Sequence, residues 1–200
     1  MSHIISSALI DFASIEKIIN EKLSLQLSEE SRKAIKDCRS YLDKKMASHK
    51  EPIYGINTGF GSLCNTRISN SDLSKLQENL VMSHACGAGE EVPSEIVKLM
   101  LLLKIQGLSY GKSAVQEVTV ERLIDFYNHD ILPVVYQQGS LGASGDLAPL
   151  AHLCLPLLGM GEVYFKGKKI AASVMMKEMK WQAIALQSKE GLALLNGTQF

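Results

Sequence analysis

The chain of 200 residues has no net charge, few cysteines and no long uninterrupted apolar run. Its 21 Lys and Arg residues balance 21 Asp and Glu residues, so there is no basic footprint for nucleic acid or for an anionic membrane. The four cysteines lie far apart without a CxxC pair, which fits neither a zinc site nor a disulfide framework. The five histidines show no metal-ligand spacing. These absences exclude a metal, nucleic acid and membrane as expected partners.

The first residues also lack the basic region and apolar stretch of a signal peptide. The longest apolar stretches, residues 96–105 and 147–160, are interrupted by Lys98, Lys104, Pro149, His152 and Pro156, so neither is expected to cross a membrane. Together with the scattered cysteines, this predicts a cytoplasmic protein.

What the chain does contain is an ordinary globular composition, 46% hydrophobic and 21% charged, which suffices for one domain with a core. Apolar periodicity predicts helices over residues 28–48, 71–84, 93–108 and 116–128, and the third is apolar on nearly all sides and should be buried. Residues 163–170, turning at Gly167, predict a short β-hairpin. We therefore expect a single, mainly α domain over residues 1–200. Because the chain ends in an apolar, motif-like stretch, we also expect it to be the N-terminal part of a longer protein.

The most informative segment is residues 139–150, GSLGASGDLAPL. At its centre, the amide nitrogen of Gly145 can attack the carbonyl carbon of Ala143. Loss of water and of the Ser144 hydroxyl would then leave a methylidene-imidazolone, an electrophile made from the backbone. Glycine hinders this approach least. By itself Ala-Ser-Gly is common, and Asp146 followed by Pro149 is equally typical of a glycine loop that enters a buried helix.

Three further segments carry functional side chains. Residues 54–61, YGINTGFG, form a glycine-rich loop that begins with Tyr54; a phosphate cradle is the alternative, although the Walker lysine and the G-x-G-x-x-G context are missing. Ser83 and His84 close a predicted helix, where a histidine commonly acts as a cap, with Gly87 at the C′ position. Residues 189–199 hold Asn196 before a glycine, which also fits a plain helix end.

In this order and at these separations, the four segments resemble the aromatic amino acid ammonia-lyase and aminomutase family over residues 54–199. The resemblance implies the family's helical fold, continuing into a helical bundle, and a methylidene-imidazolone group formed from Ala143, Ser144 and Gly145, with no metal or nucleotide. The implied catalytic residues are Tyr54 as the base, the three ring-forming residues and Asn196. The implied substrate-binding residues are Ser83, His84 and Gly61, and the supporting residues are Asn57 and Asp146.

Within the family, Ser83-His84 resembles the members that act on histidine. This implies the elimination of ammonia from L-histidine to give urocanate in histidine catabolism, by a homotetramer whose sites combine several subunits. The present residues alone are then expected to be inactive. Two alternatives stay open: a tyrosine or phenylalanine ammonia-lyase or aminomutase of the same family, and a non-catalytic helical scaffold.

Overall fold

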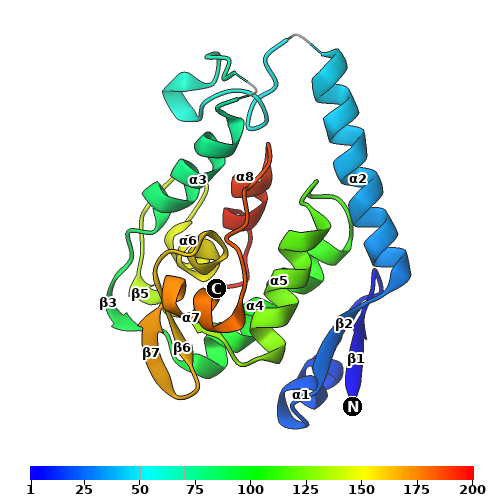
Figure 1. Ribbon diagram of the computed structural model, residues 1–200, viewed down its shortest axis with the longest axis vertical. Helices are drawn as coiled ribbons and strands as arrows, with labels where there is room; N and C mark the ends of the chain where they lie inside the picture. Colours follow the sequence, from blue (N-terminus) through cyan, green and yellow to red (C-terminus); the bar gives the residue numbers. More distant parts are fainter. Residues whose placement is uncertain (50, 70) are drawn as a thin grey trace.

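The protein is described here by a computed structural model that covers residues 1–49, 51–69 and 71–200 and is mainly helical, as expected (Figure 1). The helices are α1 (Phe12–Asn20), α2 (Glu29–Ser48), α3 (Leu73–His84), α4 (Ser94–Ser109), α5 (Glu117–Asn128), α6 (Ala148–Cys154), α7 (Ala172–Met179) and α8 (Glu190–Leu195). Two 3₁₀ segments span Gly61–Leu63 and Leu155–Leu158. The strands are β1 (Ser2–Ile5), β2 (Ser24–Leu27), β3 (Ala88–Glu91), β4 (Leu132–Pro133), β5 (Tyr136–Gln138), β6 (Glu162–Phe165) and β7 (Lys168–Ala171).

The four predicted helices are confirmed as α2, α3, α4 and α5, with ends shifted by at most a few residues. Local chemistry explains their boundaries. The Ser28 hydroxyl, for example, accepts the backbone N–H of Ser31 at 3.1 Å and so caps α2. The predicted hairpin is confirmed as β6 and β7. Lys166 and Gly167 both have positive φ, at 51° and 74°, which is the geometry of the two-residue turn that matches the twist of the flanking strands.

The remaining strand pairs were not predicted. Strand β1 pairs in parallel with β2 across the intervening helix α1, and β3 pairs antiparallel with β5. Strand β4 adds to the hairpin to give the sheet order β4-β6-β7. Each of these strands has no more than four residues, so none shows a recognisable alternation of polar and apolar residues.

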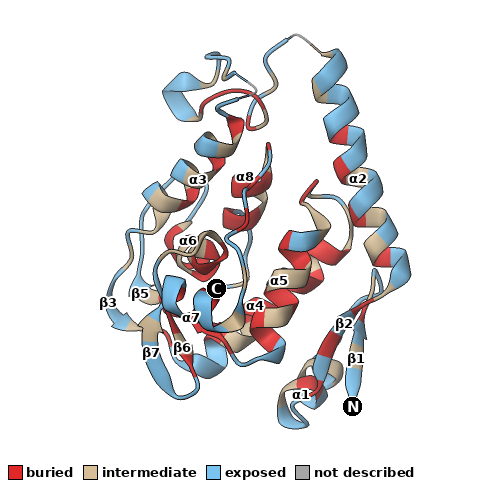
Figure 2. Cartoon of the chain, viewed as in Figure 1, coloured by how far each residue is buried: buried red, intermediate tan, exposed pale blue. Residues whose placement is uncertain are grey.

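Helix α4 forms the centre of the hydrophobic core, where it packs on α5 and also contacts α2, β1 and β4. Met100, Leu101, Leu102 and Ile105 are fully buried. Figure 2 shows the buried residues concentrated on the central helices, whereas α2 exposes its outer side. The expectation that α4 is buried all round is wrong at Ile96, which is 42% exposed, because the first turn of the helix projects from the core.

Helix α8 packs between α3 and α6. Gly191 permits this approach, since an added Cβ would lie 2.9 Å from the backbone oxygen of Gln77. The Gln77 side chain also accepts the N–H of Gly191 at 2.9 Å. The short C-terminal helix is thereby held directly against α3, which carries His84. In the described part of the chain, no helix is long and apolar enough to cross a membrane.

Candidate active site

Four segments that are distant in sequence line one open cavity of about 330 Å³. Seven predicted residues lie on its wall: Tyr54, Gly61, His84, Ala143, Ser144, Gly145 and Asn196. Sequence reasoning missed five apolar wall residues: Phe60, Leu80, Leu147, Leu192 and Leu195. Asn57, Ser83 and Asp146 do not line the cavity. The structure therefore brings the predicted reactive groups together and adds apolar surfaces on which a planar substrate ring can lie.

The Ala-Ser-Gly tripeptide occupies a tight exposed turn. The N–H of Gly145 donates to the carbonyl of Gly142 at 3.1 Å, so Ala143 and Ser144 are its two central residues. Gly145 has a φ of 80°, in the left-handed region where glycine is favoured. No atom lies within 4 Å of a Cβ built on Gly145. The backbone is thus already bent at the tripeptide, and the space beside Gly145 is open.

Asp146 fastens this turn to helix α6. Its Oδ1 accepts the N–H of Ser140 at 2.9 Å and the N–H of Ala148 at 3.0 Å. The helix begins at Ala148 with Leu147 as its N-cap, so Asp146 stands one residue before the cap. A Cβ added at Gly139 would overlap the Asp146 carboxylate. One carboxylate oxygen therefore joins the residues on either side of the turn, Ser140 and Ala148.

The loop that carries Tyr54 is held from within by Asn57, which is 1% exposed. Asn57 Oδ1 accepts the N–H of Ile53 at 2.6 Å, and Nδ2 donates to the carbonyl of Glu51 at 3.2 Å. Tyr54 is 60% exposed and its ring meets that of Phe60 edge-on, with centroids 5.9 Å apart. Asn57 thus orders the loop, and Phe60 orients the tyrosine ring at the edge of the cavity.

His84 is the last residue of α3, and its Nδ1 lies 2.8 Å from the carbonyl oxygen of Leu80. A carbonyl only accepts, so in the neutral ring Nδ1 carries the proton and Nε2 is an acceptor. The Ser83 hydroxyl donates to the same carbonyl at 3.1 Å. Ser83 is therefore a neighbour of His84 and not a wall of the cavity. Gly87 is not the C′ residue, because α3 ends with Ala85 as its C-cap.

Asn196 follows directly after α8 and lines the cavity. Its backbone N–H donates to Leu192 at 3.0 Å. Its carbonyl accepts a hydrogen bond from the buried ammonium of Lys104 at 2.9 Å. Sequence reasoning missed Lys104, although a lysine inside an apolar run of helix was the available signal.

With this geometry established, the chain can be compared with known proteins. The family model described as aromatic amino acid lyase matches residues 10–200. The chain belongs to the aromatic amino acid lyase family. Histidine ammonia-lyase of Legionella pneumophila subsp. pneumophila is 47% identical over 196 residues, which are 98% of this chain and 38% of that protein. The chain therefore spans less than two fifths of the length of such curated relatives.

Solved structures of the family have the same fold. Histidine ammonia-lyase from Trypanosoma cruzi superposes with a TM-score of 0.88 at 33% identity, covering 100% of this chain and 38% of that one. Phenylalanine aminomutase of Pantoea agglomerans gives a TM-score of 0.90 at 32% identity, covering 99% of this chain and 38% of that one. Members with different reactions are thus about equally similar in backbone, so the fold does not choose the substrate.

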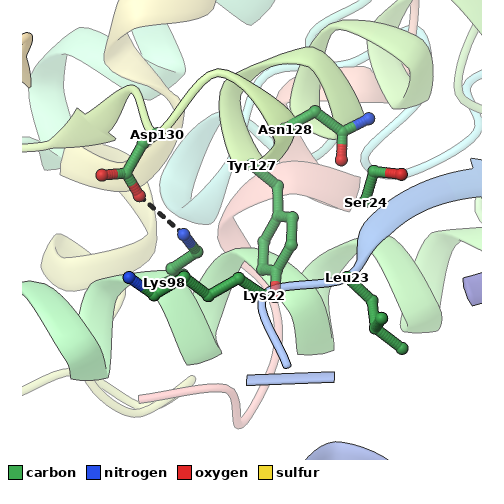
Figure 3. A pocket seen from close by; sticks show the side chains of 7 residues that line it. All are labelled: Lys22, Leu23, Ser24, Lys98, Tyr127, Asn128 and Asp130. Atoms are coloured by element: carbon green, nitrogen blue, oxygen red, sulfur yellow. Dashed lines mark hydrogen bonds and ion pairs between the residues drawn. The ribbon is translucent and has the colours of Figure 1, made fainter. Parts of the chain in front are cut away.

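A second cavity of about 330 Å³ lies where the residues before β2 meet α4 and α5. Figure 3 shows Lys98 and Asp130 joined by an ion pair of 2.6 Å at its edge. The Lys98 ammonium also lies 5.1 Å from the centre of the Tyr127 ring. None of the lyase-family site residues lines this cavity. Lys98 is engaged in structural contacts, and the cavity around residues 143–145 remains the candidate site.

The residues of that cavity fit the family's prosthetic group. The turn at residues 142–145 is exposed, and Gly145 has a positive φ and open space around the position of a Cβ, which suits ring closure between Gly145 and Ala143. No group of three or more His, Cys, Asp or Glu side chains that could hold a metal occurs among residues 1–49, 51–69 and 71–200.

Proposed function

We propose that this chain forms part of a histidine ammonia-lyase, which eliminates ammonia from L-histidine to give urocanate. The observation that carries the proposal is the convergence of Tyr54, His84, Asn196 and the turn at residues 142–145 on one cavity. The 47% identity to a histidine ammonia-lyase supports it. The methylidene-imidazolone made from Ala143, Ser144 and Gly145 supplies an electrophile that no ordinary side chain offers.

Tyr54 is the proposed base that takes the proton from the β-carbon of the substrate. Its exposed position at the edge of the cavity leaves the hydroxyl open to a ligand, and the edge-on contact with Phe60 limits the orientation of its ring. A base contributes only when it is within hydrogen-bond reach of the proton that it removes. Orientation by Phe60 and by the Asn57-held loop would supply this alignment.

His84 is the residue that we propose to recognise the substrate side chain. Because its Nδ1–H is directed to Leu80, the neutral ring presents Nε2 as an acceptor, which matches an N–H of the substrate imidazole. Leu80 and Leu195 contribute apolar walls of the cavity. An acceptor beside apolar walls suits a flat ring that carries an N–H. When phenylalanine binds instead, Nε2 of His84 would have no hydrogen-bond partner.

Asn196 is the proposed hydrogen-bond partner of the prosthetic group, and Gly61 belongs to the loop that covers the cavity. Asn57 and Asp146 hold their loops in place by the hydrogen bonds described above. A homotetramer and a cytoplasmic location stay predictions, as does the assembly of each complete site from several subunits.

A tyrosine or phenylalanine lyase or aminomutase is the second candidate, favoured by the similarity of the phenylalanine aminomutase structure. The kcat/KM values of the full-length protein for histidine, phenylalanine and tyrosine distinguish the two. Preference for histidine supports the first candidate, and preference for either of the others replaces it.

The direct test is the mass of the full-length protein. The wild-type chain should lack the mass of two waters, mapped to the peptide that contains Ala143, Ser144 and Gly145. Ser144→Ala should lack that loss and all lyase activity. An unmodified tripeptide in folded, full-length wild-type protein would leave the non-catalytic scaffold as the explanation.

A further inference from the structure

Lys104 is a buried cation in the middle of the apolar helix α4. It is 2% exposed, and its neighbours Leu101, Leu102 and Ile105 are fully buried. Burying an ammonium group is costly unless hydrogen bonds replace its water. A lysine at this position therefore calls for specific partners.

The partners of Lys104 are two backbone carbonyls at the end of α8. Its Nζ donates to Ala193 and to Asn196, at 2.9 Å each. The last carbonyls of a helix have no partner within the helix and carry partial negative charge. The ammonium thus caps α8 from inside the core, and one of its two hydrogen bonds ends on the residue that reaches the cavity.

No carboxylate shares this environment among the described residues. The neighbouring titratable group is Cys154 of α6, and burial raises the pKa of its thiol to about 11. Burial lowers the pKa of Lys104 to about 8, so the amine still carries its proton at neutral pH. The charge of Lys104 is consequently directed at the two carbonyls.

The other end of α8 is held by a buried charge of opposite sign. Glu190 is 0% exposed, and its Oε1 accepts the N–H of Gln116 and the hydroxyl of Thr119, at 2.7 Å each. A helix of six residues is not stable alone. Glu190 at its start and Lys104 at its end each complement the helix dipole, so α8 has one fixed position along its axis.

We propose that Lys104 is a positioning residue for the reaction proposed above: it fixes the Asn196 peptide and thereby aims the Asn196 side chain at residues 143–145. Lys104 does not line the cavity, so it acts through Asn196. The inference rests on the proposed function for its kinetic part, whereas its structural part, the immobilisation of Asn196, does not.

The kinetic experiment is a double-mutant cycle between Lys104→Met and Asn196→Ala in the full-length protein. Lys104→Met should lower kcat about 100-fold, the loss that a misplacement of about 1 Å can cause, with little change in KM. In the Asn196→Ala background it should lower kcat no more than about 2-fold further, because residues that act through one another are not additive. Losses that multiply in the double variant would overturn the proposal.

Lys98→Met is the matched control. It removes a lysine from the same helix, at a side chain paired with Asp130 outside the cavity, and should leave kcat unchanged. Lys104→Gln keeps a neutral donor at the critical position and should lose less than Lys104→Met. If neither Lys104 variant folds, Lys104 is only a structural residue and the proposal is wrong.

Amide hydrogen exchange supplies a readout that needs no activity. The peptide covering residues 190–198 should exchange faster in Lys104→Met than in wild type and in Lys98→Met. Unchanged exchange would refute the immobilisation of Asn196. Should the wild-type protein release no ammonia from histidine, the proposed function fails, while the exchange measurement still decides whether Lys104 holds Asn196.

Discussion

Removing the Asp146 carboxylate should slow the formation of the prosthetic group. Asp146→Ala leaves the N–H groups of Ser140 and Ala148 without their shared acceptor. Each of the two hydrogen bonds contributes about 1 kcal/mol, so losing both costs about 2 kcal/mol. Since about 1.4 kcal/mol is a factor of ten, the ratio of ordered to disordered loop should fall about 30-fold, and ring formation should slow by up to about 30-fold.

Two other variants separate the acceptor from the charge. Asp146→Asn keeps an oxygen that accepts both N–H groups, so its rate should stay within about 3-fold of wild type if hydrogen bonding is what matters. Gly139→Ala keeps the carboxylate but adds a Cβ that overlaps it, and should therefore behave like Asp146→Ala.

The assay follows the full-length protein after a pulse of synthesis. The fraction of chains that have lost two waters is measured against time by mass spectrometry of the peptide containing residues 143–145. Formation at the wild-type rate in Asp146→Ala would refute the argument from loop order. A rate in Asp146→Asn as low as that in Asp146→Ala would show that the negative charge matters more than the two hydrogen bonds.

Three further predictions concern Tyr54, His84 and His152. Tyr54→Phe should lower kcat at least about 100-fold, the lower range for loss of a general base, with the mass loss at residues 143–145 retained; an unaffected kcat would remove Tyr54 from the mechanism. His84→Leu should lower the ratio of kcat/KM for histidine to that for phenylalanine, and a constant ratio would mean that His84 does not read the substrate. Burial lowers the pKa of His152 below its ordinary value of 6.5, and its Nε2 accepts the N–H of Gly87 at 3.0 Å. The folded state then binds fewer protons than the unfolded state. Neutral His152 therefore contributes to the free energy of unfolding above pH 6.5, and this contribution is lost as the pH falls through the lowered pKa. The free energy of unfolding should fall more steeply between pH 7 and pH 5 (about the range around an ordinary histidine) in wild type than in His152→Gln; equal slopes would contradict it.

Much of the fold was predictable because local signals determine it. The helix beginning after Ser28 has a cap and an apolar stripe, and the hairpin has Gly167 at its turn. The pairing of β1 with β2 was not predictable, because it joins two four-residue strands across a helix. Such pairing depends on contacts that are distant in sequence and leave no periodic pattern.

In the site, too, the separate motifs were predictable from local sequence, whereas their arrangement in space was not. Tyr54, His84, Ser144 and Asn196 were found as separate motifs, since each stands in a distinctive local sequence. Their meeting at one cavity is a property of the packed helices. The apolar wall residues had no signal of their own, because a leucine beside a cavity has the same sequence environment as a leucine in the core.

Helix α8 also has a consequence for the order in which the protein assembles. Its two buried anchors, Thr119 to Glu190 and Lys104 to Asn196, join residues 71 and 92 positions apart. Both contacts tie α8 to α4 or α5, and contacts of such long range form against a large loss of chain entropy. We therefore expect Asn196 to take its place on the cavity wall beside residues 143–145 late in folding. A reactive electrophile would then be matched with its partner late in folding, when competing thiols and amines of the unfolded chain are already out of reach.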